Sequence, residues 1–179
     1  MTKFIIYIAI GMSLLLTSCN NKPNLQTYFA DNQEKAGFTT FDISPSILNV
    51  DKTKLSSEEK ETIDSFEKMN VLAFKINPKN KNQYTVEKEK VRTILKDTAN
   101  YHQLMKFGMG AQGVSISYVG TDENIKEFVL FGNKDDAGFG VVRVLGNHMK
   151  PENAMSLLSI LKNSNIDTEQ LKVLKNIMK

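Results

Sequence analysis

Cys19, the only cysteine in the 179-residue chain, is the most nucleophilic side chain in the sequence. Its thiol ionises to a thiolate, which readily accepts an alkyl or acyl group. It follows Lys3 and a mainly apolar segment, residues 4–16. A helix that crosses a bilayer needs about 20 residues, so this shorter segment with a basic flank is typical of a signal peptide. The sequence therefore predicts an exported protein.

Leu16-Thr17-Ser18, the three residues before Cys19, resemble the lipobox of bacterial lipoproteins. Leu16 does not suit an ordinary signal-peptidase site, which requires small residues at both specificity positions. The resemblance implies cleavage between Ser18 and Cys19, diacylglycerol on the thiol, and an acyl chain such as palmitate on the new amine. Two or three chains anchor a protein stably, at about 0.8 kcal/mol per buried CH₂. The alternatives are a buried core cysteine and a plain secretory signal.

The length and charge of the remaining chain define its organisation. We expect a cleaved signal peptide over 1–18, a lipidated cysteine and polar tether over 19–24, and one α+β domain over 25–179, which is an ordinary domain length. The formal net charge is only +3. A nucleic-acid-binding protein would carry a basic stripe, so no nucleic-acid partner is expected.

The first half of the domain shows both helical and strand patterns. Apolar residues recur every three or four positions over 25–35, 57–69 and 85–99, which predicts amphipathic helices. Ser56 and Glu59 have the spacing of a capping box at the start of the second helix. Apolar, β-branched and aromatic residues over 38–43 and 71–76 predict two strands.

The second half predicts a sheet followed by two helices. Four runs separated by turn residues, 101–109, 114–119, 125–131 and 139–145, favour an antiparallel meander. Pro151 suits the first turn of a helix, and a last helix is expected over 167–178. The fold class is therefore α+β, with about four C-terminal strands and one or two earlier strands packed against helices. The strand order stays open.

Two glycine-rich segments invite a nucleotide-binding interpretation. Residues 108–113 read G-x-G-x-x-G, but a dinucleotide-binding turn requires the last glycine to open a helix. Gly113 instead opens an alternating strand, so a hairpin turn is expected there. Gly138-Phe139-Gly140 is likewise expected to be a turn between strands. No cofactor is expected.

Metal ligands are few. Asp122-Glu123 and Asp135-Asp136 lack the regular ladder of oxygen ligands of a calcium loop. His102 and His148 are the only histidines, and with no second cysteine they cannot form a His/Cys zinc site. No metal site is expected.

No catalytic motif is present. The chain has neither a G-x-S-x-G elbow nor an H-E-x-x-H motif, and lipid would occupy its one thiol. No catalytic residue is therefore named, although a dispersed acid/base pair can meet only in the fold. Lys172, Lys175 and Lys179 flank the apolar stripe of the last expected helix. Such a helix can lie on anionic lipid, but an ordinary core-covering helix has the same pattern.

The whole chain resembles the family of domain of unknown function 4252, found in lipoproteins of Bacteroidota-type bacteria. The likeness rests on the lipobox, on two early segments and on three later ones. The early segments are Gly37-Phe38-Thr39 and Ile43-Ser44, and the later ones are residues 101–105, residues 127–130 and Leu145-Gly146. The resemblance implies an envelope lipoprotein with an α+β domain and supplies no catalytic residue. Asn20-Asn21-Lys22 lacks the acidic residues linked to surface export, which favours the periplasmic face of the outer membrane.

Three functions follow as hypotheses. The leading one is a lipid-anchored envelope protein with a non-catalytic binding or accessory domain, whose partner is another envelope protein or component. The second is a lipid-anchored enzyme with an unrecognised site, for which His102 or His148 should lie in a pocket beside a buried carboxylate. The third is a structural envelope protein. Exposed aromatics such as Tyr118, Phe128 or Phe139 would favour the binding domain.

Overall fold

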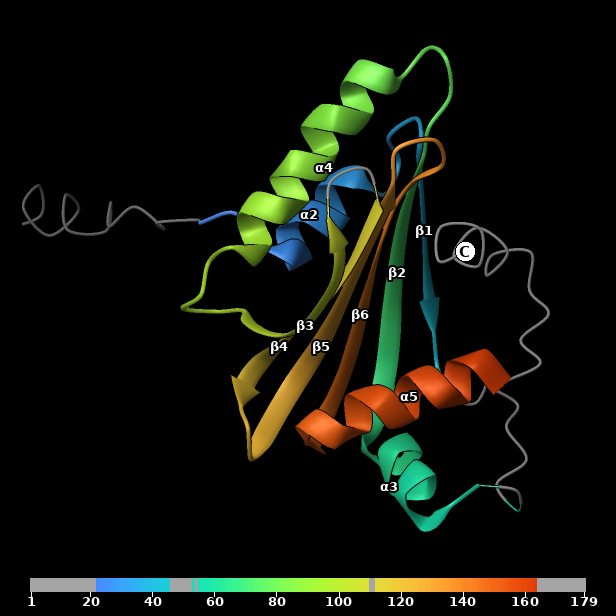
Figure 1. The fold of residues 1–179 in the computed structure, drawn as a ribbon, viewed down its shortest axis with the longest axis vertical. Coiled ribbons are helices and arrows are strands. Elements are labelled where there is room, and N and C mark those ends of the chain that lie inside the picture. Colours follow the sequence, from blue (N-terminus) through green and yellow to red (C-terminus); the bar gives the residue numbers. More distant parts are fainter. Residues whose placement is uncertain (1–21, 46–52, 54, 110–111, 164–179) are drawn as a thin grey trace, which may run out of the picture.

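A computed structural model describes residues 22–45, 53, 55–109 and 112–163 (Figure 1). In chain order the elements are α2 (Leu25–Asn32), β1 (Phe38–Ile43), α3 (Ser57–Ser65), β2 (Phe66–Lys75), α4 (Lys81–Leu95), β3 (His102–Met109), β4 (Gln112–Thr121), β5 (Asn124–Lys134), β6 (Gly138–Met149) and α5 (Pro151–Asn163). Over these described ranges, no helix combines the length and apolar character needed to cross a membrane.

The six strands form one antiparallel sheet in the order β1-β2-β6-β5-β4-β3. Strands β3 to β6 are the meander predicted from the sequence, because each pairs with the next along the chain. The β1–β2 pair joins this meander at β6, where Val71 pairs with Val142. The α+β fold class, with two earlier strands, is confirmed.

Helices cover both faces of the sheet (Figure 1). Successive side chains of a strand point to opposite faces, so Leu72 and Phe74 of β2 lie toward α2 and α4, whereas Met69 and Val71 lie toward α5. The core beneath α2 and α4 consists of Leu25, Tyr28, Phe29, Leu72, Phe74, Tyr84, Val91, Ile94, Tyr101, Val129, Phe131, Phe139 and Val141. The core on the opposite face consists of Ile43, Phe66, Met69, Val71, Ile116, Ile125, Phe128, Val142, Val144, Met149, Ala154 and Leu157.

Aromatic rings occupy the centre of the α2–α4 side. Phe74 and Phe139 pair across β2 and β6, and their rings stack with centroids 5.5 Å apart. Phe38 packs edge-on against Phe74 at 4.9 Å. The predicted turn over 138–140 is therefore wrong. The turn lies over 135–137, and β6 begins at Gly138, because a fully buried Phe139 gains more from the core than a turn would give it.

The predicted helix over 57–69 ends early. The capping box is confirmed, because Glu59 N donates to Ser56 Oγ at 3.1 Å and Ser56 N donates to Glu59 Oε2 at 2.9 Å. However, α3 stops at Ser65, and Phe66 already pairs with Gly146 of β6. A register shift between Phe66 and Lys68 breaks the regular alternation there, so Phe66 and Met69 reach the same core. Strand pairing outweighs the helical spacing that the sequence shows.

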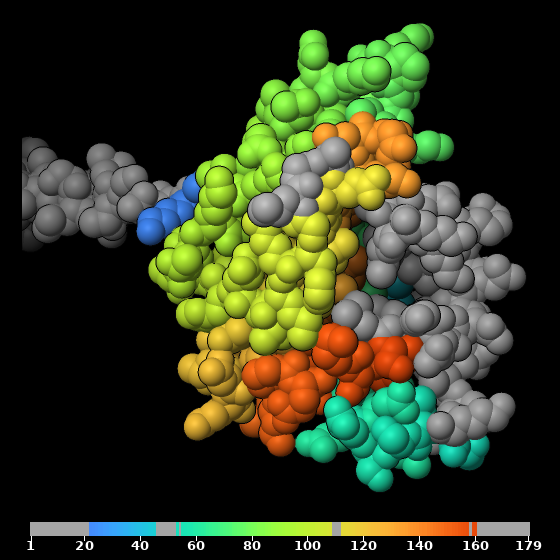
Figure 2. Space-filling model, in the orientation of Figure 1, coloured from blue at the N-terminus to red at the C-terminus, as the bar shows by residue number. Residues whose placement is uncertain are grey.

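Helices α3 and α5 pack together at one end of the molecule (Figure 2). The contact is polar as well as apolar. Asn153 Nδ2 donates to the Thr62 hydroxyl at 2.8 Å, and the Ser156 hydroxyl donates to Glu58 at 2.7 Å. As predicted, α5 begins at Pro151. The last predicted helix, over 167–178, lies outside the described residues.

The close approach of β2 and β6 depends on Gly138. Its φ is 136°, and a Cβ placed there would lie 1.9 Å from the carbonyl oxygen of Phe74. We expect Gly138→Ala to lower the free energy of unfolding by at least about 2 kcal/mol, measured by urea denaturation. Gly113→Ala is the matched control, because a Cβ there meets no atom closer than 3.5 Å. Equal effects of the two substitutions would contradict this role of Gly138.

Candidate functional site

The residues that carry the anchor prediction, Leu16, Thr17, Ser18 and Cys19, lie outside the described residues. The two histidines do not meet. His102 is on β3 and His148 is near the end of β6, and β4 and β5 separate these strands. Both side chains are exposed, and neither lines the hollows described below. The arrangement expected of the enzyme hypothesis is therefore not formed by these histidines.

One carboxylate of each acidic pair has a structural partner. Asp122 accepts a hydrogen bond from the Tyr118 hydroxyl in the β4–β5 turn. Asp135 accepts from the Tyr84 hydroxyl at 2.7 Å and from Lys88 Nζ at 2.9 Å. Across the described ranges, no three His, Cys, Asp or Glu side chains converge as metal ligands.

The glycine-rich segment is a hairpin, as predicted. Strand β3 ends at Met109, β4 begins at Gln112, and Gly108 pairs with Gly113 across the hairpin. Gly113 therefore lies within a strand, where it cannot present a helix N-terminus to a phosphate. Gly110 and Ala111 lie outside the described residues.

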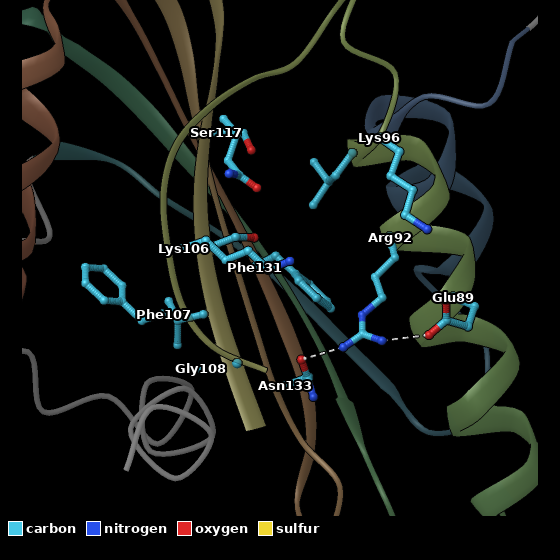
Figure 3. A pocket seen from close by; sticks show the side chains of 14 residues that line it. Glu89, Arg92, Lys96, Lys106, Phe107, Gly108, Ser117, Phe131 and Asn133 are labelled. Carbon is cyan, nitrogen blue, oxygen red and sulfur yellow. Dashed lines mark hydrogen bonds and ion pairs between the residues drawn. The ribbon is translucent and has the colours of Figure 1, made fainter. Parts of the chain in front are cut away.

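A hollow of about 340 Å³ opens between α4 and the β3–β4 hairpin (Figure 3). We call it the basic hollow. It is lined by Glu89, Arg92, Leu95, Lys96, Gln103, Lys106, Phe107, Gly108, Gly113, Val114, Ser115, Ser117, Phe131 and Asn133. Its volume falls at the lower end of the range of small-molecule sites.

Local structure explains why these side chains meet. Arg92 and Lys96 are four residues apart, so they project from the same side of α4. Ser115 and Ser117 alternate along β4 and face α4, because they pair with Phe131 and Val129 of the core beneath that helix. Lys106 of β3 pairs with Ser115 and so shares this face. Figure 3 shows Arg92 reaching from the helix toward Asn133 of the sheet, while Phe107 points away.

Positive charge dominates the lining of the basic hollow. Three cationic residues, Arg92, Lys96 and Lys106, face the single carboxylate of Glu89. Arg92 Nη1 donates to Glu89 at 2.9 Å, and Arg92 Nη2 donates to Asn133 Oδ1 at 3.3 Å. Neither lysine forms an ion pair with any residue that the structure describes. A concave surface of one sign concentrates anions from solution.

A network of tyrosines and charges holds α4 in place. Burial, the hydrogen bond to Glu87 and its charge raise the pKa of Tyr28 well above its usual range, so its hydroxyl stays protonated and donates to Glu87 at 2.9 Å. Burial and Asp135 raise the pKa of Tyr84 in the same way. The hydrogen bonds of Tyr84 and Lys88 lower the pKa of Asp135, which keeps it ionised. These contacts fix the backbone that presents Arg92 and Lys96.

The described lining of the basic hollow offers groups that can bind a ligand. Among the described lining residues, Ser115 and Ser117 are the ones with hydroxyl groups, and no histidine lies beside them. Leu95 and the buried ring of Phe131 provide an apolar wall. The arrangement offers charge, hydrogen-bond donors and one flat surface.

A second hollow, of about 840 Å³, separates α2 from α4 and is more apolar. Val86, whose side chain is 55% exposed, and Ile94 line it from α4, and Pro23 and Asn24 line it from the segment before α2. This hollow therefore lies beside the predicted tether.

Under α2 lies a buried ion pair. Arg143 donates to Glu127 through Nε at 2.7 Å and through Nη2 at 2.9 Å, and the two side chains are only 11% and 12% exposed. Burial alone lowers the pKa of Arg143, but the hydrogen bond and charge of Glu127 outweigh it, so the net shift is upward. Each partner of the pair compensates the charge of the other, and Arg143 Cζ lies 5.6 Å from the centre of the Phe29 ring. We therefore assign the pair a structural role.

A family model described as a domain of unknown function, DUF4252, matches residues 28–157. The chain belongs to the DUF4252 family. This confirms the family resemblance drawn from the sequence. The match runs from α2 into α5, so the whole sheet and the basic hollow lie within the DUF4252 domain. No curated protein and no solved structure matches the chain.

The lining of this DUF4252 hollow was not predicted from the sequence. Arg92 and Lys96 resemble ordinary solvent-facing residues of an amphipathic helix, and Ser115 and Ser117 look like the polar face of a strand. Two signals were present in the sequence, namely two basic residues four apart on one helix and two serines that alternate along one strand. In the structure Ser117 is only 4% exposed. The exposed aromatic face that would favour the binding domain is not formed by Phe128 and Phe139, which are fully buried, and Tyr118 is half-buried. Among the described residues the exposed aromatic ring is that of Phe107.

Breaking the buried ion pair should destabilise the DUF4252 domain. Glu127→Gln leaves the Arg143 charge without a counter-ion, so we expect a loss of about 3 kcal/mol in the free energy of unfolding. Glu61→Gln is the control, because the Glu61–Lys150 contact is long, at 3.9 Å, and exposed, and should contribute less than about 1 kcal/mol. A joint Glu127→Leu, Arg143→Met variant should recover most of the loss. Chemical denaturation of the four proteins would refute the assignment if Glu127→Gln and Glu61→Gln behaved alike.

Proposed function

We propose that this DUF4252 protein is a lipid-anchored protein of the bacterial cell envelope whose domain binds an envelope component without catalysing a reaction. The observation that carries the binding half is the basic hollow. Its described lining holds three cationic residues and several hydrogen-bond donors beside one carboxylate, and no histidine or cysteine. The anchor half rests on Lys3, the apolar segment over 4–16 and the lipobox that ends at Cys19.

The geometry favours binding over the rival enzyme hypothesis. An active site of scattered residues would bring an acid/base pair together in a cleft. The histidines instead lie on separated strands, and Glu127 is occupied by Arg143. The absence of acidic residues at 20–22 supports the periplasmic face of the outer membrane as the location.

The anchor has a direct test in the intact mass of the membrane-extracted protein. We expect the wild type to have lost residues 1–18 and gained the mass of a diacylglyceryl group and one acyl chain. Cys19→Ala should remain uncleaved and unmodified, because the thiol that accepts the lipid is gone. Ser18→Ala is the matched control, since it keeps a small residue before Cys19, and it should be processed normally. A wild-type protein that is cut but carries no lipid would contradict the anchor.

The binding role has a test in envelope membranes. A photo-reactive amino acid in place of Gln103, on the rim of the basic hollow, should form an adduct of defined mass. The same amino acid in place of Lys126, exposed on β5 and outside the hollow, should not. Lys106→Gln should weaken the adduct at position 103, because it removes one of the cations. Equal labelling at both positions would argue against a binding site here.

A further inference from the structure

The charge balance of the basic hollow specifies the kind of ligand. Arg92, Lys96 and Lys106 exceed the charge of Glu89 by two. A single carboxylate ligand would compensate only one of these charges, whereas a phosphomonoester carries about −1.5 to −2 at pH 7. Resting on the binding role proposed above, we propose that the basic hollow binds a phosphomonoester attached to a sugar or a small hydroxylated headgroup.

The donors match the acceptors of such a group. A phosphomonoester presents three terminal oxygens, and arginine and lysine bind them through charge-assisted hydrogen bonds. Arg92 is held in place by its bonds to Glu89 and Asn133. These bonds use two of the five N–H donors of the guanidinium. Lys96 and Lys106 line the hollow from opposite sides, at the end of α4 and on β3, so the cations come from both of its walls.

The rest of the lining favours a hydroxylated body for the ligand. Ser115, Ser117 and Gln103 stand on neighbouring strands, where Ser117 pairs with Gln103. Hydroxyl and amide groups both donate and accept hydrogen bonds, as sugar hydroxyls require. The ring of Phe131 offers a flat apolar surface beside them. A lipid tail would need a continuous apolar channel, so we place only the headgroup in the hollow.

Calorimetric titration of the full-length protein in detergent tests this assignment. The probes are glucose 1-phosphate, glucose and glucuronate, which differ in the anionic group. Glucose 1-phosphate should bind at least about tenfold more tightly than glucuronate, and glucose should not bind measurably. Lys106→Gln and Lys96→Gln should each weaken glucose 1-phosphate binding by about tenfold. Lys81→Gln and Lys126→Gln, which change exposed lysines outside the hollow, should leave binding unchanged.

Two further probes separate the sources of the phosphate. Dihexanoyl phosphatidic acid carries a phosphomonoester and dihexanoyl phosphatidylglycerol a phosphodiester, and both short-chain lipids are soluble. Stronger competition by phosphatidic acid than by glucose 1-phosphate would identify a lipid headgroup as the ligand. Stronger binding of glucose 1-phosphate would identify a sugar phosphate.

The failure of this inference differs from the failure of the proposed function. If glucuronate binds as tightly as glucose 1-phosphate, with the same dependence on Lys106, the hollow binds anions but the phosphomonoester assignment is overturned. If glucose 1-phosphate binding is equally lost in Lys81→Gln, or is absent in the wild type, the assignment is also overturned. In each case the proposed function is still tested separately, by the intact mass of the membrane-extracted protein and by the photo-adduct at position 103.

Discussion

A sheet that is apolar on both faces must be covered on both faces, and most of this structure follows from that constraint. The central strands β2 and β6 present large buried side chains in both directions, such as Val71 and Val142 on one face and Phe74 and Phe139 on the other. Each of these side chains contributes about 1.5–3 kcal/mol when it leaves water. Helices α2 and α4 cover one face and α5 the other, so the chain alternates between strands and helices that belong to different layers.

The basic hollow lies where this coverage ends. Helix α4 buries Phe131 and Val129, but beside them β4 places Ser115 and Ser117, and the described core on this face includes no residue of β3. Apolar residues at these positions would need another helix to cover them, and the serines do not. The network around Tyr84 ties α4 to the β5–β6 turn, so the cations of the helix are held over these serines rather than over the aromatic core. The site and the core share one helix.

The sequence was sufficient for most elements and insufficient for their assembly. Local signals, namely the capping box at Ser56 and Pro151 at the start of α5, predicted where α3 and α5 begin, because capping depends on residues close in the chain. The helix expected over 85–99 lacked such a signal, and α4 begins four residues earlier, at Lys81. The end of α3 was mispredicted, because Phe66 pairs with Gly146 of β6, eighty residues later in the chain. The basic hollow was missed for the same reason. Arg92, Lys106 and Ser115 belong to three elements, and only the sheet order brings them together.

The position of β2 beside β6 has a consequence for how the chain folds. The β3–β6 meander forms from neighbouring segments, whereas Phe74 meets Phe139 only after the intervening helix and three strands have been made. Non-local pairings of this kind slow folding, because the entropy of closing a long loop is lost before the contacts form that compensate for it. Synthesis proceeds from the N-terminus, so the β1–β2 pair is made before β6, and the edge of β2 that will pair with β6 is unpaired until then. That edge, rich in apolar residues, is the part of a newly made chain most in need of protection from aggregation until β6 arrives.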